Sequence, residues 1–153
     1  MLTPLIMIGL LVVPYGVARM LRLSKSKREW AGVLGLVAVF LFTGVGHFLE
    51  TESLGQMIPS SIPMRTLAVQ ISGAIEIIAA LALLVPGLRN RVGWLLIWML
   101  LLFLPINIYA ALSRIPVGGH AWGPVYLWIR VPLQLLLMIW TYRFATHSAR
   151  EET

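Results

Sequence analysis

Two charged side chains lie inside long apolar stretches of the sequence. Glu76 is in the run that follows Arg65, and Arg130 is in the run that follows Pro124. Ionisable groups are costly in hydrocarbon, so by default they mark a functional site and have a partner. At a rise of about 1.5 Å per residue, Glu76 lies about 16 Å along a helix from Arg65, and Arg130 about 9 Å from Pro124. An arginine side chain reaches several ångströms, so a Glu76–Arg130 pair is feasible.

Other polar residues in these and the neighbouring runs lie at depths similar to those of Glu76 and Arg130. Gln134 is four residues after Arg130 and shares its helix face. Asn107 lies about 10 Å inward from the end of its run, and Pro105 before it should disturb the helix and free a carbonyl group. His47 is close to the end of another run. We therefore predict a polar ligand pocket in the outer half of a helix bundle, formed by His47, Glu76, Asn107, Arg130 and Gln134.

The same cluster also has a purely structural interpretation. Glu76, Arg130, Asn107 and Gln134 can hold helices together through hydrogen bonds alone, or form an interface with another protein. His47 is either a structural histidine or a proton-transfer group at the mouth of the pocket. His120 follows two glycines, and we expect it to be solvated in a flexible loop.

The composition identifies lipid as the solvent of the chain. The 153 residues are 59% hydrophobic and only 12% charged, whereas a soluble globular domain has about 25% charged residues. A water-soluble fold could not cover its surface with so few charges, and a disordered chain could not leave so much apolar surface solvated. The length is enough for a single domain over residues 1–153.

Cysteine content and charge exclude several other classes of protein. The chain has no cysteine, which excludes thiol catalysis, disulfides and thiolate-bound zinc or iron–sulfur clusters within it. No metal site is predicted. The net charge of +6 could indicate nucleic-acid binding, but the basic residues cluster beside the apolar runs, as in the loops of membrane proteins. The expected partner is therefore the lipid bilayer and not nucleic acid.

Five apolar runs are long enough to cross a bilayer, which takes about 20 residues. They are predicted over residues 2–20, 30–49, 66–87, 92–112 and 125–144. The predicted fold is all-α, a polytopic bundle of five transmembrane helices. Only the four residues Leu88-Arg89-Asn90-Arg91 connect the third and fourth runs, so these runs should form an antiparallel pair. The segment between Glu50 and Arg65 is expected to lie on the membrane surface or to form a lid over a cavity.

The distribution of Lys and Arg predicts the orientation of the bundle. Cytoplasmic loops are enriched in these residues, which favours a topology with the N-terminus outside and the C-terminus inside. Only Arg65 and Arg114 then fall outside. The basic cluster follows the first apolar run, so we expect a retained helix and not a signal peptide. The residues placed on the inner side are Arg19, Arg22, Lys25, Lys27, Arg28, Arg89, Arg91, Arg143 and Arg150.

Several short motifs, spread over about residues 35–142, resemble those of the DoxX-like membrane family. The resemblance implies a four-helix core formed by the second to fifth runs, with the first run as an extra N-terminal helix. It also implies a bacterial cytoplasmic (inner) membrane protein. The motifs are Phe42-Thr43-Gly44-Val45-Gly46-His47-Phe48, Met57-Ile58-Pro59 with Pro63, Ser72-Gly73-Ala74-Ile75-Glu76, Pro105-Ile106-Asn107 and Arg130-Val131-Pro132-Leu133-Gln134.

Our leading hypothesis is a pocket for a small amphipathic molecule with a polar head, such as a quinone or a lipid. Arg130, Gln134 and Asn107 would donate hydrogen bonds to its oxygens, and Glu76 would hold Arg130 in place. Some DoxX-like relatives are associated with quinone-linked sulfur oxidation or defence against oxidants, which implies a membrane subunit of such a system. The sequence shows no redox-cofactor motif, so a soluble oxidoreductase would have to supply the electrons.

The alternative is a non-enzymatic assembly or scaffold protein that recognises other membrane proteins. An animal branch of the DoxX-like family assists receptor assembly, and the polar cluster would then be structural. A homo-oligomer is compatible with either function. A proton-coupled transporter is disfavoured, because no polar path reaches the inner face. The sequence leaves open whether the chain is an enzyme.

Overall fold

A computed structural model describes residues 2–147, which form helices and short connections without any strand. Arg150, which the sequence places on the inner side, lies outside the described residues. Three short segments of other helix types accompany the α-helices: η1 (Pro86–Leu88) and η2 (His120–Tyr126) are 3-10 helices, and η3 (Tyr142–His147) is a π-helix. The α-helices are α1 (Leu2–Met20), α2 (Lys25–Leu49), α3 (Thr51–Gly55), α4 (Arg65–Ala82), α5 (Arg89–Leu112) and α6 (Leu127–Thr141).

Five helical stretches of the described chain are long and apolar enough to cross a membrane. This confirms the all-α fold and the predicted number of spans, and the chain is an integral membrane protein. The five-residue helix α3 is too short to be a span. The five stretches are Leu2–Met20, Lys25–Leu49, Arg65–Ala82, Pro86–Leu112 and His120–His147.

Several helix ends differ from the predicted ends, because a helix does not have to stop where its apolar run stops. α2 begins at Lys25 and not at residue 30, so its first turn is polar. α4 ends at Ala82 and not at residue 87. Val85 is extended, with φ −94° and ψ 110°, the conformation that a following proline imposes. Pro86 therefore begins η1, which separates α4 from α5.

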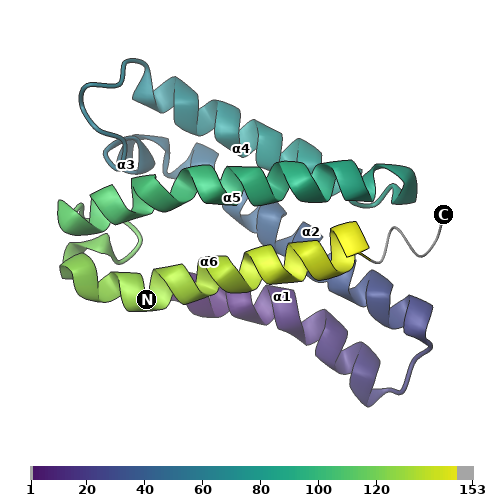
Figure 1. Cartoon of the computed structure of the whole chain (residues 1–153). Coiled ribbons are helices and arrows are strands. Elements are labelled where there is room, and N and C mark those ends of the chain that lie inside the picture. Colours follow the sequence, from purple (N-terminus) through teal and green to yellow (C-terminus); the bar gives the residue numbers. More distant parts are fainter. Residues whose placement is uncertain (1, 148–153) are drawn as a thin grey trace.

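The helix α2 lies at the centre of the bundle, where it contacts α1, α4 and α6. The helix α5 contacts both α4 and α6. α4 and α5 run in opposite directions (Figure 1), which confirms the antiparallel pair expected from their short connection. The N-terminus of α1 therefore lies at the same end of the bundle as the C-terminal ends of α2 and α5.

Apolar side chains fill the opposite half of the bundle, near the α1–α2 and α4–α5 connections. Leu36, Leu83 and Leu96 are fully buried there, in one cluster that extends to η3. The buried hydroxyls of Thr141 and Thr146 donate to carbonyls of their own turns, Leu137 at 2.7 Å and Tyr142 at 2.6 Å. The polar groups of these two buried threonines are therefore satisfied within their own helix turns.

Arg89, which the sequence places on the inner side between the third and fourth runs, is buried in this apolar half. Its Nε donates to the Leu83 carbonyl at 3.0 Å, just beyond the end of α4. Its guanidinium lies 3.8 Å from the centre of the Trp30 ring, a cation–π contact. Arg89 thus joins the end of α4 to the start of α2.

Candidate functional site

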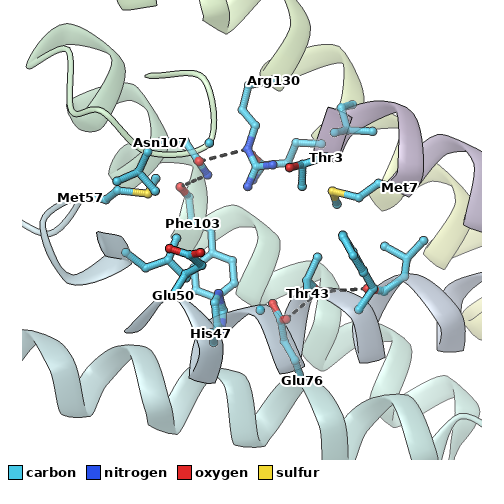
Figure 2. A pocket seen from close by; sticks show the side chains of 18 of the residues that line it. Thr3, Met7, Thr43, His47, Glu50, Met57, Glu76, Phe103, Asn107 and Arg130 are labelled. Atoms are coloured by element: carbon cyan, nitrogen blue, oxygen red, sulfur yellow. Dashed lines mark hydrogen bonds between the residues drawn. The ribbon is translucent and has the colours of Figure 1, made fainter. Parts of the chain in front are cut away.

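A cavity of about 790 Å³ occupies the half of the bundle that contains the N-terminus. Small-molecule sites in proteins typically measure about 300–1,000 Å³. All five residues predicted from the sequence line this cavity, and Figure 2 shows four of them around it. Side chains from four different spans therefore share one cavity, and their role toward a ligand stays a prediction. The five are His47 of α2, Glu76 of α4, Asn107 of α5, and Arg130 and Gln134 of α6.

Arg130 is held by an amide from the neighbouring helix. Its Nε donates to Oδ1 of Asn107 at 3.0 Å. The amide nitrogen of Asn107 in turn donates to the Phe103 carbonyl at 2.8 Å, which fixes the amide on α5. A guanidinium has five N–H donors, and Nε–H is the only one with a partner among the described residues. The terminal nitrogens of Arg130 are therefore available to the cavity (Figure 2).

Glu76 is buried on the other side of the cavity and has a different partner. It accepts a hydrogen bond from Thr43 Oγ1 at 2.7 Å. The two charged groups form no ion pair, so the Glu76–Arg130 pair considered from the sequence is not formed. The reason is the rotation of the helices: α6 turns Arg130 toward α5, and α4 turns Glu76 toward α2 (Figure 2). Asn107, and not Glu76, holds Arg130 in place.

His47 is fixed by a polar contact and a ring contact. Its Nδ1 lies 3.3 Å from Ser72 Oγ, and the Ser72 hydroxyl donates to the Val69 carbonyl at 2.8 Å. Which of the two groups donates in the contact between Ser72 and His47 depends on the tautomer of the ring. The ring also meets Phe103 edge-on at 6.0 Å between centroids.

Gln134 is only 5% exposed, and only one of the two polar atoms of its amide has a hydrogen bond among the described residues. Its Nε2 donates to the Leu100 carbonyl of α5, whereas its Oε1 has no partner. Pro105 lies inside α5 and has no N–H for the carbonyl four residues before it. Gln134 and Asn107 thus bond carbonyls on either side of this disturbed turn. The unpartnered Oε1 is a buried acceptor at the cavity wall.

His120 is not solvated, and that expectation was wrong. It is 2% exposed and lines the cavity. Its Nδ1 lies 2.7 Å from the Val117 carbonyl, and its ring packs edge-on against Tyr126 at 4.8 Å. Its Nε2 is buried without a partner. The loop after α5 folds back into the bundle as η2, so two glycines before the histidine create a turn and not a solvated tip.

The segment between Glu50 and Arg65 covers the end of the cavity. Glu50, Ser53 and Met57 line the cavity, and α3 packs against α4. Met57 and the adjacent Ile58 are buried, although both lie outside the spans. The first part of this segment thus contributes to the wall of the cavity, as the lid interpretation expects, and its position on the membrane surface stays a prediction.

Sequence reasoning missed several residues of the cavity wall. Thr43 precedes His47 by four residues on the same face of α2, and this spacing could have identified it. Phe103 of α5 also lines the cavity. Thr3 and Met7 of α1 also line the cavity, and no signal in the sequence pointed to them. In the described residues, no three His, Asp or Glu side chains are placed to hold a metal ion.

Comparisons with known proteins identify a family without an assigned activity. No curated protein and no solved structure matches the chain. A family model described as "Domain of unknown function (DUF8561)" matches residues 36–145. This segment is well over half of the chain and contains every predicted site residue, whereas α1 lies before it. The chain belongs to the DUF8561 family.

Proposed function

We propose that the cavity binds a small amphipathic molecule, a quinone or a lipid, whose polar head carries oxygen atoms. The observation that carries this proposal is the guanidinium of Arg130. It lies within a membrane span, and among the described residues only its Nε–H has a protein partner. A charged group removed from water is costly unless hydrogen bonds satisfy it. Oxygens of a ligand head would supply the missing acceptors.

The other polar groups of the cavity suit the same head. Among the described residues, Gln134 Oε1 and His120 Nε2 are buried acceptors without a partner, in side chains that line the cavity. A rotation of either side chain would let it accept from a hydroxyl of the ligand. Asn107 and Gln134 each use one amide N–H on a carbonyl and keep a second N–H for a ligand oxygen. Apolar side chains complete the wall and suit a hydrocarbon portion; they include Phe40, Leu100, Leu133 and Leu137.

We further propose that the protein is DoxX-like and has its N-terminus outside a bacterial cytoplasmic membrane, with the cavity in the outer half. The Lys and Arg distribution supports this orientation. The family resemblance is supported by motifs that contribute the cavity residues Thr43, His47, Glu76, Asn107 and Arg130. In this role the chain would be the membrane subunit of a redox or oxidant-defence system, with a soluble oxidoreductase as its partner.

A second candidate function is a membrane assembly or scaffold protein. It is favoured by the hydrogen bonds that link helices: Thr43–Glu76 joins α2 to α4, and Asn107–Arg130 joins α5 to α6. Polar side chains with a purely structural role form such bonds. Co-purification of the full chain separates the two functions. A stoichiometric soluble oxidoreductase supports the first, and varied membrane proteins support the second.

Thermal unfolding of the detergent-solubilised full chain, with and without ligand, tests the binding proposal. The probes are decylubiquinone and phosphatidylglycerol, each compared between wild type and Arg130→Met. Arg91→Met is the matched control, because Arg91 is an exposed arginine at the far end of α5. At a ligand concentration 100 times Kd, we expect wild type and Arg91→Met to be stabilised by about 2.7 kcal/mol. Arg130→Met should gain much less.

Equal stabilisation of wild type and Arg130→Met by both probes would contradict the proposed site. The absence of stabilisation in every protein would contradict binding of either ligand class. A response to decylubiquinone alone assigns the cavity to quinones, and a response to phosphatidylglycerol alone assigns it to lipids.

A further inference from the structure

The backbones of α1 and α2 approach each other very closely at Gly35. A Cβ atom added to Gly35 of α2 would lie 2.4 Å from the carbonyl oxygen of Leu11 in α1. No side chain fits between two backbones at that separation. This contact lies near the middle of α1 and fixes where the two helices cross.

Toward the C-terminal end of α2, the helix face that contacts α1 at Gly35 is no longer covered by α1. Phe42 and Leu49 follow Gly35 at intervals of seven residues, so all three lie on nearly one face. Gly35 is buried against α1, but Phe42 is 38% and Leu49 is 78% exposed. Figure 1 shows α1 and α2 moving apart from their connecting loop toward the N-terminus of α1. The two helices therefore separate in the half of the bundle that holds the cavity.

The gap between these helices is continuous with the cavity. Residues from both sides of the gap line the same cavity as Arg130 and Gln134. On the α2 side these residues have apolar side chains. They are partly exposed and lie within a membrane span. We call this gap the lateral opening; it is formed by Thr3 and Met7 of α1 and by Phe42, Val45 and Leu49 of α2.

We propose that the ligand carries a hydrocarbon chain that leaves the bundle through the lateral opening and remains in the bilayer. This inference rests on the proposed function, in which Arg130 binds the polar head. The segment with α3 lines the end of the cavity, whereas four of the five residues at the lateral opening have the apolar side chains that a lipid tail needs. α1, which lies outside the family-matched residues 36–145, supplies one side of the tail path.

Cysteine labelling tests the tail path, because the chain has no cysteine of its own. Leu49→Cys places a thiol at the lateral opening. Leu67→Cys is the matched control: Leu67 is an exposed leucine in the first turn of α4 at the same end of the bundle, and it does not line the cavity. Both variants are labelled with N-ethylmaleimide in detergent, alone and with two pairs of probes. The pairs are decylubiquinone with the same quinone ring lacking its alkyl chain, and lysophosphatidylglycerol with its glycerophosphoglycerol head.

We expect the tailed member of the pair that binds to slow labelling of Leu49→Cys about tenfold at ten times its Kd, since about one site in eleven is then free. The tail-less member should not slow it, and Leu67→Cys should react at the same rate throughout. Binding that depends on Arg130 without protection of Leu49→Cys would overturn the tail path and leave the proposed function intact. Equal protection by tailed and tail-less probes would also overturn it. If no probe shows binding that depends on Arg130, the proposed function fails, and the tail path fails with it.

Discussion

Gly44 of α2 and Gly73 of α4 lie opposite each other where the two helix backbones come into contact. A Cβ on Gly73 would lie 2.9 Å from the carbonyl oxygen of Gly44, and a Cβ on Gly44 would lie 3.0 Å from that of Gly73. Small residues allow transmembrane helices to approach this closely. His47 and Glu76 follow these glycines by three residues each. The glycine contact therefore sets the spacing of the two helices that carry one side of the cavity.

Replacing Gly73 by alanine should destabilise the bundle. The new methyl group would meet Cβ of His47 at 2.6 Å as well as the Gly44 carbonyl. Such overpacking typically costs about 1–3 kcal/mol, so the thermal unfolding midpoint of Gly73→Ala should fall clearly below that of wild type. Gly46→Ala is the control, because nothing lies within 4 Å of a Cβ at Gly46. That change should be neutral or stabilising by about 0.5–1 kcal/mol, as alanine is the better helix former. Equal midpoints for the two variants would show that the glycine contact does not constrain the bundle.

The hydrogen bond between Thr43 and Glu76 gives a second prediction. Thr43→Val keeps the shape of the side chain but removes the hydroxyl that bonds the buried carboxyl group. A buried polar group left without its partner costs about 1–3 kcal/mol, so Thr43→Val should unfold at lower temperature than wild type. Thr43→Ser retains the hydroxyl and should lose much less stability. If valine and serine variants unfold at the same temperature, the contribution of this bond is refuted.

The sequence predicted the number of spans and the convergence of five polar residues, because both depend only on depth along each helix. Apolar run length gives the spans, and a fixed rise per residue gives the depth of Glu76, Asn107 and Arg130. It did not predict which side chains would pair. Pairing depends on how each helix is rotated about its axis, and Arg130 faces Asn107 while Glu76 faces Thr43. A rotation of this kind is set by packing across the whole bundle and leaves no local signal.

Connections between spans were also poorly predicted from local composition. His120 follows two glycines, a pattern typical of a solvated turn, yet it is buried against Tyr126. His120 is buried because the loop after α5 returns to the bundle, where the His120 and Tyr126 rings pack together in the cavity wall. The sequence also did not predict that α1 contributes to the cavity wall. Thr3 and Met7 belong to an uncharged apolar helix, and their place at the cavity depends on how α1 crosses α2.

Gln134 should affect ligand affinity more than stability. In Gln134→Leu, the bond from Nε2 to the Leu100 carbonyl is lost, but the unpartnered buried Oε1 is removed as well. These two effects offset each other, because replacing imperfectly bonded polar groups by apolar ones is often nearly neutral. The unfolding midpoint should therefore stay within the range of wild type. Affinity for the responding probe should fall about tenfold, which corresponds to about 1.4 kcal/mol for one lost hydrogen bond. Isothermal titration calorimetry measures the affinity, and unchanged binding would exclude Gln134 from the ligand site.

The proposed orientation gives a prediction that needs no ligand. Ser26 lies in the first turn of α2 and Ser113 follows the last residue of α5, so the two exposed serines lie at opposite ends of the bundle. In intact bacteria, a membrane-impermeant maleimide should label Ser113→Cys and should reach Ser26→Cys only after lysis. The wild-type chain, which has no cysteine, gives the background. The expected pattern follows from the excess of Lys and Arg near Ser26. The reverse pattern would place Arg130 and the cavity in the cytoplasmic half, where an oxidoreductase partner would have to be cytoplasmic as well.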